Sequence, residues 1–169
     1  IVCFGPLDLD PSAVPAGVLH PRRIRAGVVA GVADYGNKIG VPTVAGAIVH
    51  DPSYTTTPLV FAGCVGLLPH GSHRTRPQAG DAVVVLGGAV GRDGVGGATF
   101  SSQSMGAETA DIAGSSVQIG DPFTGKRLIE VSVELVERGL ALSLQDCGAA
   151  GLASSLSEMA ADYGIDVHL

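Results

Sequence analysis

The chain has 169 residues, of which 46% are hydrophobic and 15% are charged, and it contains 25 glycines and no tryptophan. This length allows one domain or parts of two, and the glycine content is typical of packed strands and helices joined by tight turns. The formal net charge of −6 and the lack of a basic stretch argue against a nucleic-acid partner. No apolar run is long enough to cross a bilayer, so no membrane role is expected.

The cysteines predict a reducing environment. Cys3, Cys64 and Cys147 are odd in number and widely spaced, and the five histidines show no metal-site spacing. Reduced thiols are typical of a cytoplasmic protein. The chain opens at Ile1 without a methionine, which we interpret as a piece of a longer protein.

The first half predicts one helix and two strands. Pro21 suits the first turn of a helix, apolar residues then recur at helical spacing, and Gly36 is the expected stop. Residues 43–49 and 59–68 are rich in β-branched or apolar residues and are expected to form strands. A loop is expected between them.

A polar break at residues 69–80 follows, and we interpret it as a domain boundary or hinge. The short apolar run 82–86 predicts a buried strand. The Gly-rich run 87–97 predicts irregular backbone, which could wrap a phosphate with its N–H groups or allow close packing between domains.

The last third of the sequence predicts a helix, a strand and a second helix. A helix is expected to stop near Gly139, a buried strand to cover residues 140–144, and a second helix to run from residue 152 to 163 with Gly164 as its stop. This alternation indicates an α/β or α+β fold and argues against a helical bundle.

Asp146 is the first candidate for chemistry, because it follows an apolar run and precedes the turn Gly-Ala-Ala-Gly. Ligand sites favour the carboxyl ends of strands in open α/β sheets. A carboxylate there suits a hard cation such as Mg²⁺. The alternative is that Asp146 caps the helix that follows.

Gln118, in the segment Gln-Ile-Gly-Asp-Pro-Phe, is the second candidate. Its amide can both donate and accept, which suits the orientation of a substrate and not proton transfer. The alternative is a loop side chain that bonds its own backbone. Residues 120–127 nearly match a Walker phosphate loop, but Arg127 stands where Ser or Thr is needed and Pro122 removes an N–H group. We therefore expect Pro122 to begin a helix with Asp121 near its positive end.

Four stretches carry a family resemblance: residues 31–44, 91–100, 118–123 and 145–152. In this order they resemble the synthetase portion of the phosphoribosylformylglycinamidine synthases (formylglycinamide ribonucleotide amidotransferases), which belong to the aminoimidazole ribonucleotide synthetase-like superfamily. The likeness extends over nearly the whole chain. Two departures are Ala-Gly-Ala at residues 45–47, where many members have Gly-Gly-Glu, and Cys147, where Met is frequent.

The resemblance implies a domain organisation. Residues 1–72 would be the C-terminal part of an N-terminal, barrel-forming synthetase domain. Residues 73–80 would be a linker, and residues 81–169 would begin a C-terminal α/β domain. In the family the barrel strands pair between two copies of the domain, which implies a homo-oligomer.

The resemblance also implies an activity. The parent would be an ATP-dependent ligase of purine biosynthesis, converting formylglycinamide ribonucleotide and glutamine-derived ammonia to the amidine with the help of a glutaminase domain or subunit. Gln118 would contact the substrate and Asp146 would bind Mg²⁺. The catalytic histidine and the ATP-holding residues of the family have no counterpart here, so this chain alone is expected to be inactive. The alternatives are a sister ligase or kinase with another substrate and a non-catalytic structural or interface segment.

Overall fold

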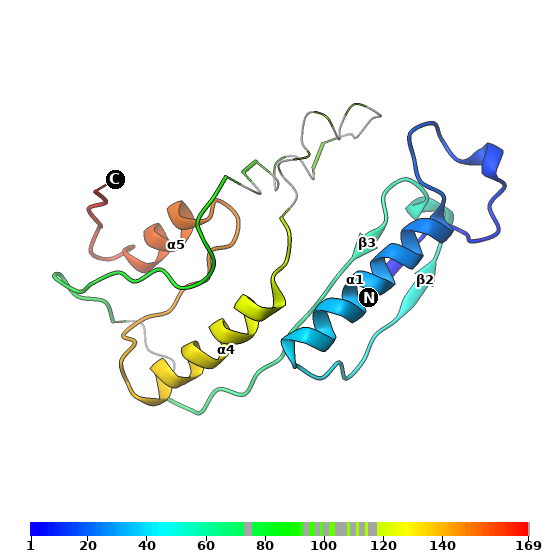
Figure 1. Cartoon of the computed structure of the whole chain (residues 1–169). Helices are drawn as coiled ribbons and strands as arrows, with labels where there is room; N and C mark the ends of the chain where they lie inside the picture. Colours follow the sequence, from blue (N-terminus) through cyan, green and yellow to red (C-terminus); the bar gives the residue numbers. More distant parts are fainter. Residues whose placement is uncertain are drawn as a thin grey trace. The chain divides into compact units, whose positions relative to one another are not determined.

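The computed structural model describes residues 1–72, 76–92, 95–96, 99, 102–103, 108, 111, 114 and 118–168. The chain forms two compact units, the first built mainly from residues 1–65 and 119–123 and the second mainly from residues 66–92 and 124–168. Figure 1 traces the elements in chain order: β1, η1, α1, β2, η2, β3, α4 and α5.

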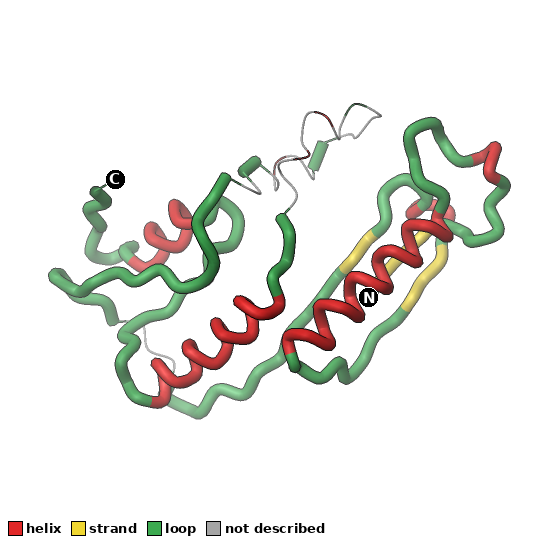
Figure 2. Tube along the Cα trace, in the orientation of Figure 1, coloured by secondary structure: helices red, strands yellow, loops and turns green. Residues whose placement is uncertain are grey.

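The first unit contains a three-stranded sheet with the order β2-β1-β3. The strands are β1 (Val2–Phe4), β2 (Ile48–His50) and β3 (Leu59–Val60), drawn in yellow in Figure 2. β1 pairs in parallel with β2 and antiparallel with β3. The central strand is therefore the one that sequence patterning did not predict.

The two predicted strands of the first half are present but much shorter. Of the expected range 43–49 only Ile48 and Val49 are in a strand, and of 59–68 only Leu59 and Val60. Each shortened strand pairs only with β1, which is three residues long. A strand needs a partner for its backbone groups, so the length of β1 limits both neighbours.

A small core holds this unit together. Phe4 is fully buried and Cys3 is 5% exposed, while Pro21, the first residue of α1, is also fully buried. The ring of Phe4 lies 6.1 Å from that of His50, and its carbonyl accepts a hydrogen bond of 2.9 Å from the N–H of Asp51. The core thus joins β1, β2 and the start of α1.

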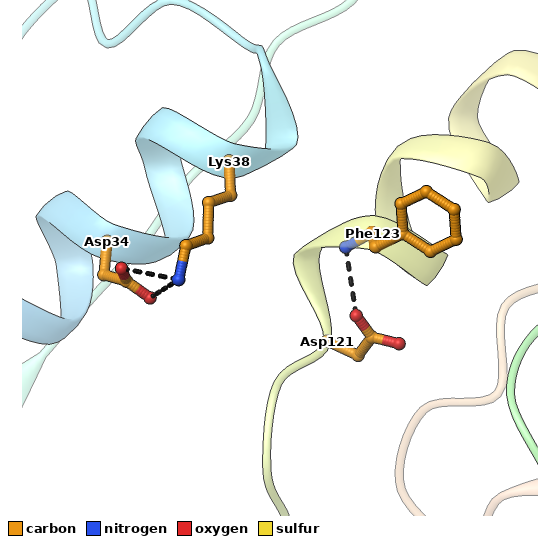
Figure 3. A network of polar contacts seen from close by, with 4 residues as sticks. All are labelled: Asp34, Lys38, Asp121 and Phe123. Carbon is orange, nitrogen blue, oxygen red and sulfur yellow. Dashed lines mark hydrogen bonds and ion pairs between the residues drawn. The ribbon is translucent and has the colours of Figure 1, made fainter.

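Helix α1 (Pro21–Ile39) begins at the predicted proline. His20 is its N-cap, with Nδ1 accepting from the N–H of Arg22 at 3.1 Å. The helix continues past Gly36, the predicted stop, and ends at Gly40, where φ is 71°. Lys38 forms an ion pair with Asp34 at 2.7 Å one turn earlier (Figure 3), which supports the extra turn.

Helix α4 (Pro122–Glu137) begins at Pro122 as predicted. The Oδ1 atom of Asp121 accepts a hydrogen bond of 3.0 Å from the N–H of Phe123, as Figure 3 shows. A carboxylate at this end of a helix satisfies a free N–H group and interacts favourably with the helix dipole. The chain leaves the helix through Gly139, with φ of 67°, close to the predicted end.

Two predicted strands are wrong. Residues 82–86 and 140–144 lie outside any strand. Their apolar side chains are largely exposed, as with Val84 at 72% and Leu140 at 65%. Within the described residues, the backbone of these runs has no continuous pairing partner; the N–H of Arg76 donates to the carbonyl of Leu142 at 3.3 Å as a single bond. Apolar composition alone does not make a strand without a neighbour.

Helix α5 (Leu152–Met159) is shorter than the predicted range 152–163. A turn replaces its expected last residues: the N–H of Gly164 donates to the carbonyl of Ala160 at 2.7 Å, and Gly164 has a φ of 74°. The glycine therefore ends the turn and not the helix. In the described ranges, no helix combines the length and apolarity needed to span a membrane.

We expect the chain to self-associate, because both outer strands of the sheet expose apolar side chains. Ile48 is 48% exposed and Val60 is 47% exposed. Unpaired backbone groups on such edge strands are a template for pairing with another chain. Light scattering over a concentration series should give a mass above the 16.9 kDa monomer at about 100 μM.

A charge on the edge supplies the matched test. Val60→Lys should shift the mass towards the monomer, since edge lysines oppose strand pairing. Thr57→Lys adds the same charge in the preceding loop and should leave the mass unchanged. A monodisperse monomer of the unchanged chain would contradict the prediction.

We expect Asp51 to make stability depend on pH. It caps the 3₁₀ helix η2 (Pro52–Tyr54), and hydrogen bonds from the Ser53 hydroxyl and then the Ser53 N–H lower its pKa below 3.8. The stabilisation is therefore complete above pH 3.8 and is lost as the pH falls through the lowered value. Asp51→Asn keeps an acceptor oxygen without this titration, so its urea midpoint should fall less steeply in acid. Parallel pH profiles would contradict this.

Candidate substrate and metal site

Gln118 lies in a non-helical segment that leads into α4, and its side chain is exposed. Gly120, two residues later, approaches another of the motif stretches. A Cβ atom built on Gly120 would lie 2.9 Å from Cε2 and 3.2 Å from Cδ2 of Tyr35 on α1. Within the first unit, Gly120 therefore lies against the stretch 31–44.

The Tyr35 contact gives a reason for the glycine that sequence reasoning missed. The φ of Gly120 is not positive, so the position does not require the conformational freedom of glycine. The need is space beside an aromatic ring. Gly36, next to Tyr35, would meet only Oγ1 of Thr43 at 3.8 Å, an ordinary contact.

We expect Gly120→Ala to destabilise the fold by about 1–3 kcal/mol, the usual cost of forcing extra atoms into an occupied space. In a Tyr35→Ala background the same change should cost little, because the ring is gone. Urea unfolding of the four proteins measures the coupling. Gly46→Ala, where the added atom meets nothing within 4 Å, is the control. An equal loss of stability in both backgrounds would show that the contact between Gly120 and Tyr35 is not its cause.

Asp146 lies in the second unit, in the turn between residue 144 and α5, and its side chain is exposed. The alternative that it caps the following helix is wrong: the N-cap of α5 is Gly151, and no side-chain capping hydrogen bond is made there. Among the residues that the structure describes, none donates a hydrogen bond to the Asp146 carboxylate. This carboxylate is free to face a ligand.

Helix α5 bonds the turn on both sides of Asp146. Before it, the side-chain amide of Gln145 donates to Glu158. After it, Sγ of Cys147 lies 3.4 Å from Oγ of Ser155, which is 3% exposed. Sequence reasoning assigned none of these contacts. The only signal was a pair of serines, Ser154 and Ser155, in the first turn of the helix predicted to follow the Gly-Ala-Ala-Gly turn.

The donor chemistry of the turn fits Mg²⁺. This ion is bound through one or two carboxylates together with substrate phosphates and water, so a single exposed carboxylate is a suitable contribution. In the described part of the chain, no group of three or more His, Cys, Asp or Glu side chains could enclose a metal by itself. Further ligands would have to come from phosphate, water or other residues.

The two phosphate-loop candidates have different outcomes. Residues 122–127 are helical, and Lys126 forms an ion pair with Glu130 at 3.2 Å, so the rejection of a Walker loop is confirmed. Residues 87–92 are irregular as predicted, with a φ of 137° at Gly87. The remainder of that run lies partly outside the described residues, and its phosphate-binding role stays a prediction.

Comparisons with known proteins identify the class. The model of the "AIR synthase related protein, C-terminal domain" matches residues 78–169, and that of the "AIR synthase related protein, N-terminal domain" matches residues 8–68. The chain belongs to the AIR synthase related family. Both the mixed α/β fold class and the superfamily expected from the motifs are confirmed.

Individual relatives narrow the resemblance. The phosphoribosylformylglycinamidine synthase subunit PurL of Methanopyrus kandleri is 47% identical over 169 residues, 98% of this chain and 22% of the relative. The PurL subunit of Aquifex aeolicus is 46% identical over 152 residues, 88% of this chain and 20% of the relative. The resemblance to the synthetase portion of these synthases is confirmed, and the chain spans about a fifth of their length.

A solved structure agrees with the sequence matches. Thermotoga maritima PurL, complexed with FGAR, is 32% identical with a TM-score of 0.62, and the match covers 95% of this chain and 24% of that one. The similarity therefore extends over both units in their chain order.

Proposed function

We propose that this chain is a segment of an ATP-dependent ligase that converts formylglycinamide ribonucleotide to formylglycinamidine ribonucleotide. The observation that carries the proposal is the 47% identity to a PurL subunit over 98% of the chain. The FGAR complex of the Thermotoga maritima relative supports the same substrate. In this proposal ATP activates the formamide oxygen, and ammonia from a glutaminase domain or partner displaces phosphate.

Two residues of this chain have proposed roles. Asp146 would contribute a carboxylate to Mg²⁺, which offsets the charge of phosphate groups during transfer. Its exposure and the lack of a capping role support this. Gln118 would orient the substrate through its amide, and the packing of Gly120 against Tyr35 would fix the segment that carries it. Neither residue is proposed to move a proton.

The same proposal includes a domain division, a cellular compartment and an oligomeric state. The domain division at residues 72 and 81 would separate the barrel-forming part from the α/β part. Cys3, Cys64 and Cys147 are all free thiols, which supports a reducing cytoplasm. The exposed edge strands support a homo-oligomer.

The test uses the full-length protein that carries this chain. Purified protein is given ATP, Mg²⁺, ammonia and formylglycinamide ribonucleotide, and amidine and ADP are measured. Turnover in the ordinary enzyme range, roughly 1–10 per second, with no turnover of other superfamily substrates, supports the proposal. Turnover of a different substrate would favour a sister ligase or kinase. No turnover of any substrate would favour a structural role.

A further inference from the structure

The turn that carries Asp146 contains backbone that must be held from outside. Ala150 has a φ of 65° and Gly151 a φ of 55°, so two successive residues have positive φ. For alanine a positive φ is unfavourable, and such residues persist where neighbouring contacts fix them. The N–H of Gly151 donates to the carbonyl of Gly148 at 3.0 Å, which closes the turn on itself.

Helix α5 supplies the external contacts. Oγ of Ser154 donates to the carbonyl of Ala149 at 2.6 Å and lies 3.0 Å from that of Gly151. Ser155 is the one buried polar residue in the described part of the chain, and its hydroxyl contacts the thiol of Cys147. Glu158, one turn further along, accepts from Gln145. The contacts therefore fall at the start, middle and end of the turn.

The pattern singles out Asp146. The residue before it and the residue after it are both bonded to α5, whereas its own carboxylate is exposed and receives no bond within the described part of the chain. Fixing both neighbours limits the directions that the intervening side chain can take. A carboxylate side chain held in this way loses less conformational freedom when it binds a metal ion.

We infer that Ser155 and Glu158 are positioning residues that hold the Asp146 carboxylate in a metal-binding orientation through Cys147 and Gln145. The inference rests on the proposed role of Asp146. Residues that orient metal ligands without touching the metal typically change metal affinity 10- to 100-fold when they are removed. The helix thus acts on Mg²⁺ affinity without contributing a ligand.

The first test measures Mg²⁺ dependence in the full-length protein. Ser155→Ala and Glu158→Ala should raise the Mg²⁺ concentration for half-maximal activity about 10-fold or more, with KM for the ribonucleotide at saturating Mg²⁺ unchanged. Glu158→Gln keeps an oxygen that accepts from Gln145 and should restore normal Mg²⁺ dependence. Ser157→Ala is the matched control, because its hydroxyl bonds only the carbonyl of Ala153 within the helix, at 2.7 Å.

The second test needs no activity. In Ser155→Cys, oxidation with diamide should join the introduced thiol to Cys147, seen as a cross-linked peptide by mass spectrometry. Two thiols lose two hydrogens to diamide, which is reduced to the hydrazine. Ser157→Cys, on the exposed face of the same helix, should give no such peptide. Equal cross-linking in both variants would refute the contact.

The outcomes separate the inference from the function beneath it. If Asp146→Asn changes Mg²⁺ dependence but Ser155→Ala and Glu158→Ala do not, the positioning role is overturned while the proposed function stands. If Asp146→Asn leaves Mg²⁺ dependence unchanged, the proposed metal role fails and the inference fails with it, even where the cross-link forms.

Discussion

Asp146→Asn is expected to lower the proposed Mg²⁺-dependent ligase activity of the full-length protein by about 100-fold or more, with an unchanged thermal midpoint. Asparagine keeps the size and one oxygen but loses the charge that a Mg²⁺ ligand needs. Even residues that only support metal ligands change affinity 10- to 100-fold, so a ligand itself should do at least as much. Stability should be unaffected, because the carboxylate does not cap α5.

The measurement compares activity, Mg²⁺ dependence and thermal unfolding for the unchanged protein, Asp146→Asn and Asp162→Asn. Asp162 is an exposed carboxylate of the same unit, in the turn after α5, so its change controls for the loss of one surface charge. Normal activity and Mg²⁺ dependence in Asp146→Asn would remove Asp146 from the site. A fall in thermal midpoint alone would point to a structural role.

Gly5→Ala is expected to destabilise the first unit by about 1–3 kcal/mol. A Cβ atom on Gly5 would lie 2.8 Å from Cα of Thr55 and 2.9 Å from Cγ of Pro21. The first of these is a backbone atom, and the second belongs to a fully buried ring, so neither can move cheaply. The added methyl group must push apart the end of β1, the start of α1 and the residue that follows η2.

Gly27→Ala is the matched control for this change. Gly27 lies inside α1, and a Cβ atom there meets nothing within 4 Å. The same substitution should therefore stabilise the helix by about 0.5–1 kcal/mol, because alanine loses less backbone entropy than glycine. Urea unfolding of the two variants should give shifts of opposite sign. Shifts of the same sign would show that lack of space around Gly5 does not determine the effect of Gly5→Ala on stability.

The sequence predicted helices better than strands, for a physical reason. Helix signals are local: Pro21 and Pro122 start the two long helices, and the apolar residues of each helix recur at helical spacing within one segment of the chain. Strand formation depends on a partner that lies elsewhere in the chain. Residues 82–86 are as apolar as a buried strand, yet they are not in one. Val2–Phe4, with only three residues, is the central strand.

The sequence predicted the residues of the candidate site but not the contacts that hold them in place. Asp146 was proposed as a ligand because it adjoins a Gly-rich turn, and the structure removed the capping alternative. The contacts from Ser155 and Glu158 depend on where α5 begins and on the left-handed conformation of Ala150, which no spacing rule provides. The packing of Gly120 against Tyr35 joins segments that are far apart in the chain, so the sequence did not predict it either.

The strand order has a consequence for the order of folding. β1 is the middle strand, yet its partners come much later: Val2 pairs with Ile48 and with Val60. Helix α1 makes local hydrogen bonds and can form early, whereas the sheet requires closure of the long segments that separate β1 from β2 and from β3. During synthesis β1 therefore has no strand partner until residues 48–50 have been made, and the three-stranded sheet is complete only after Val60.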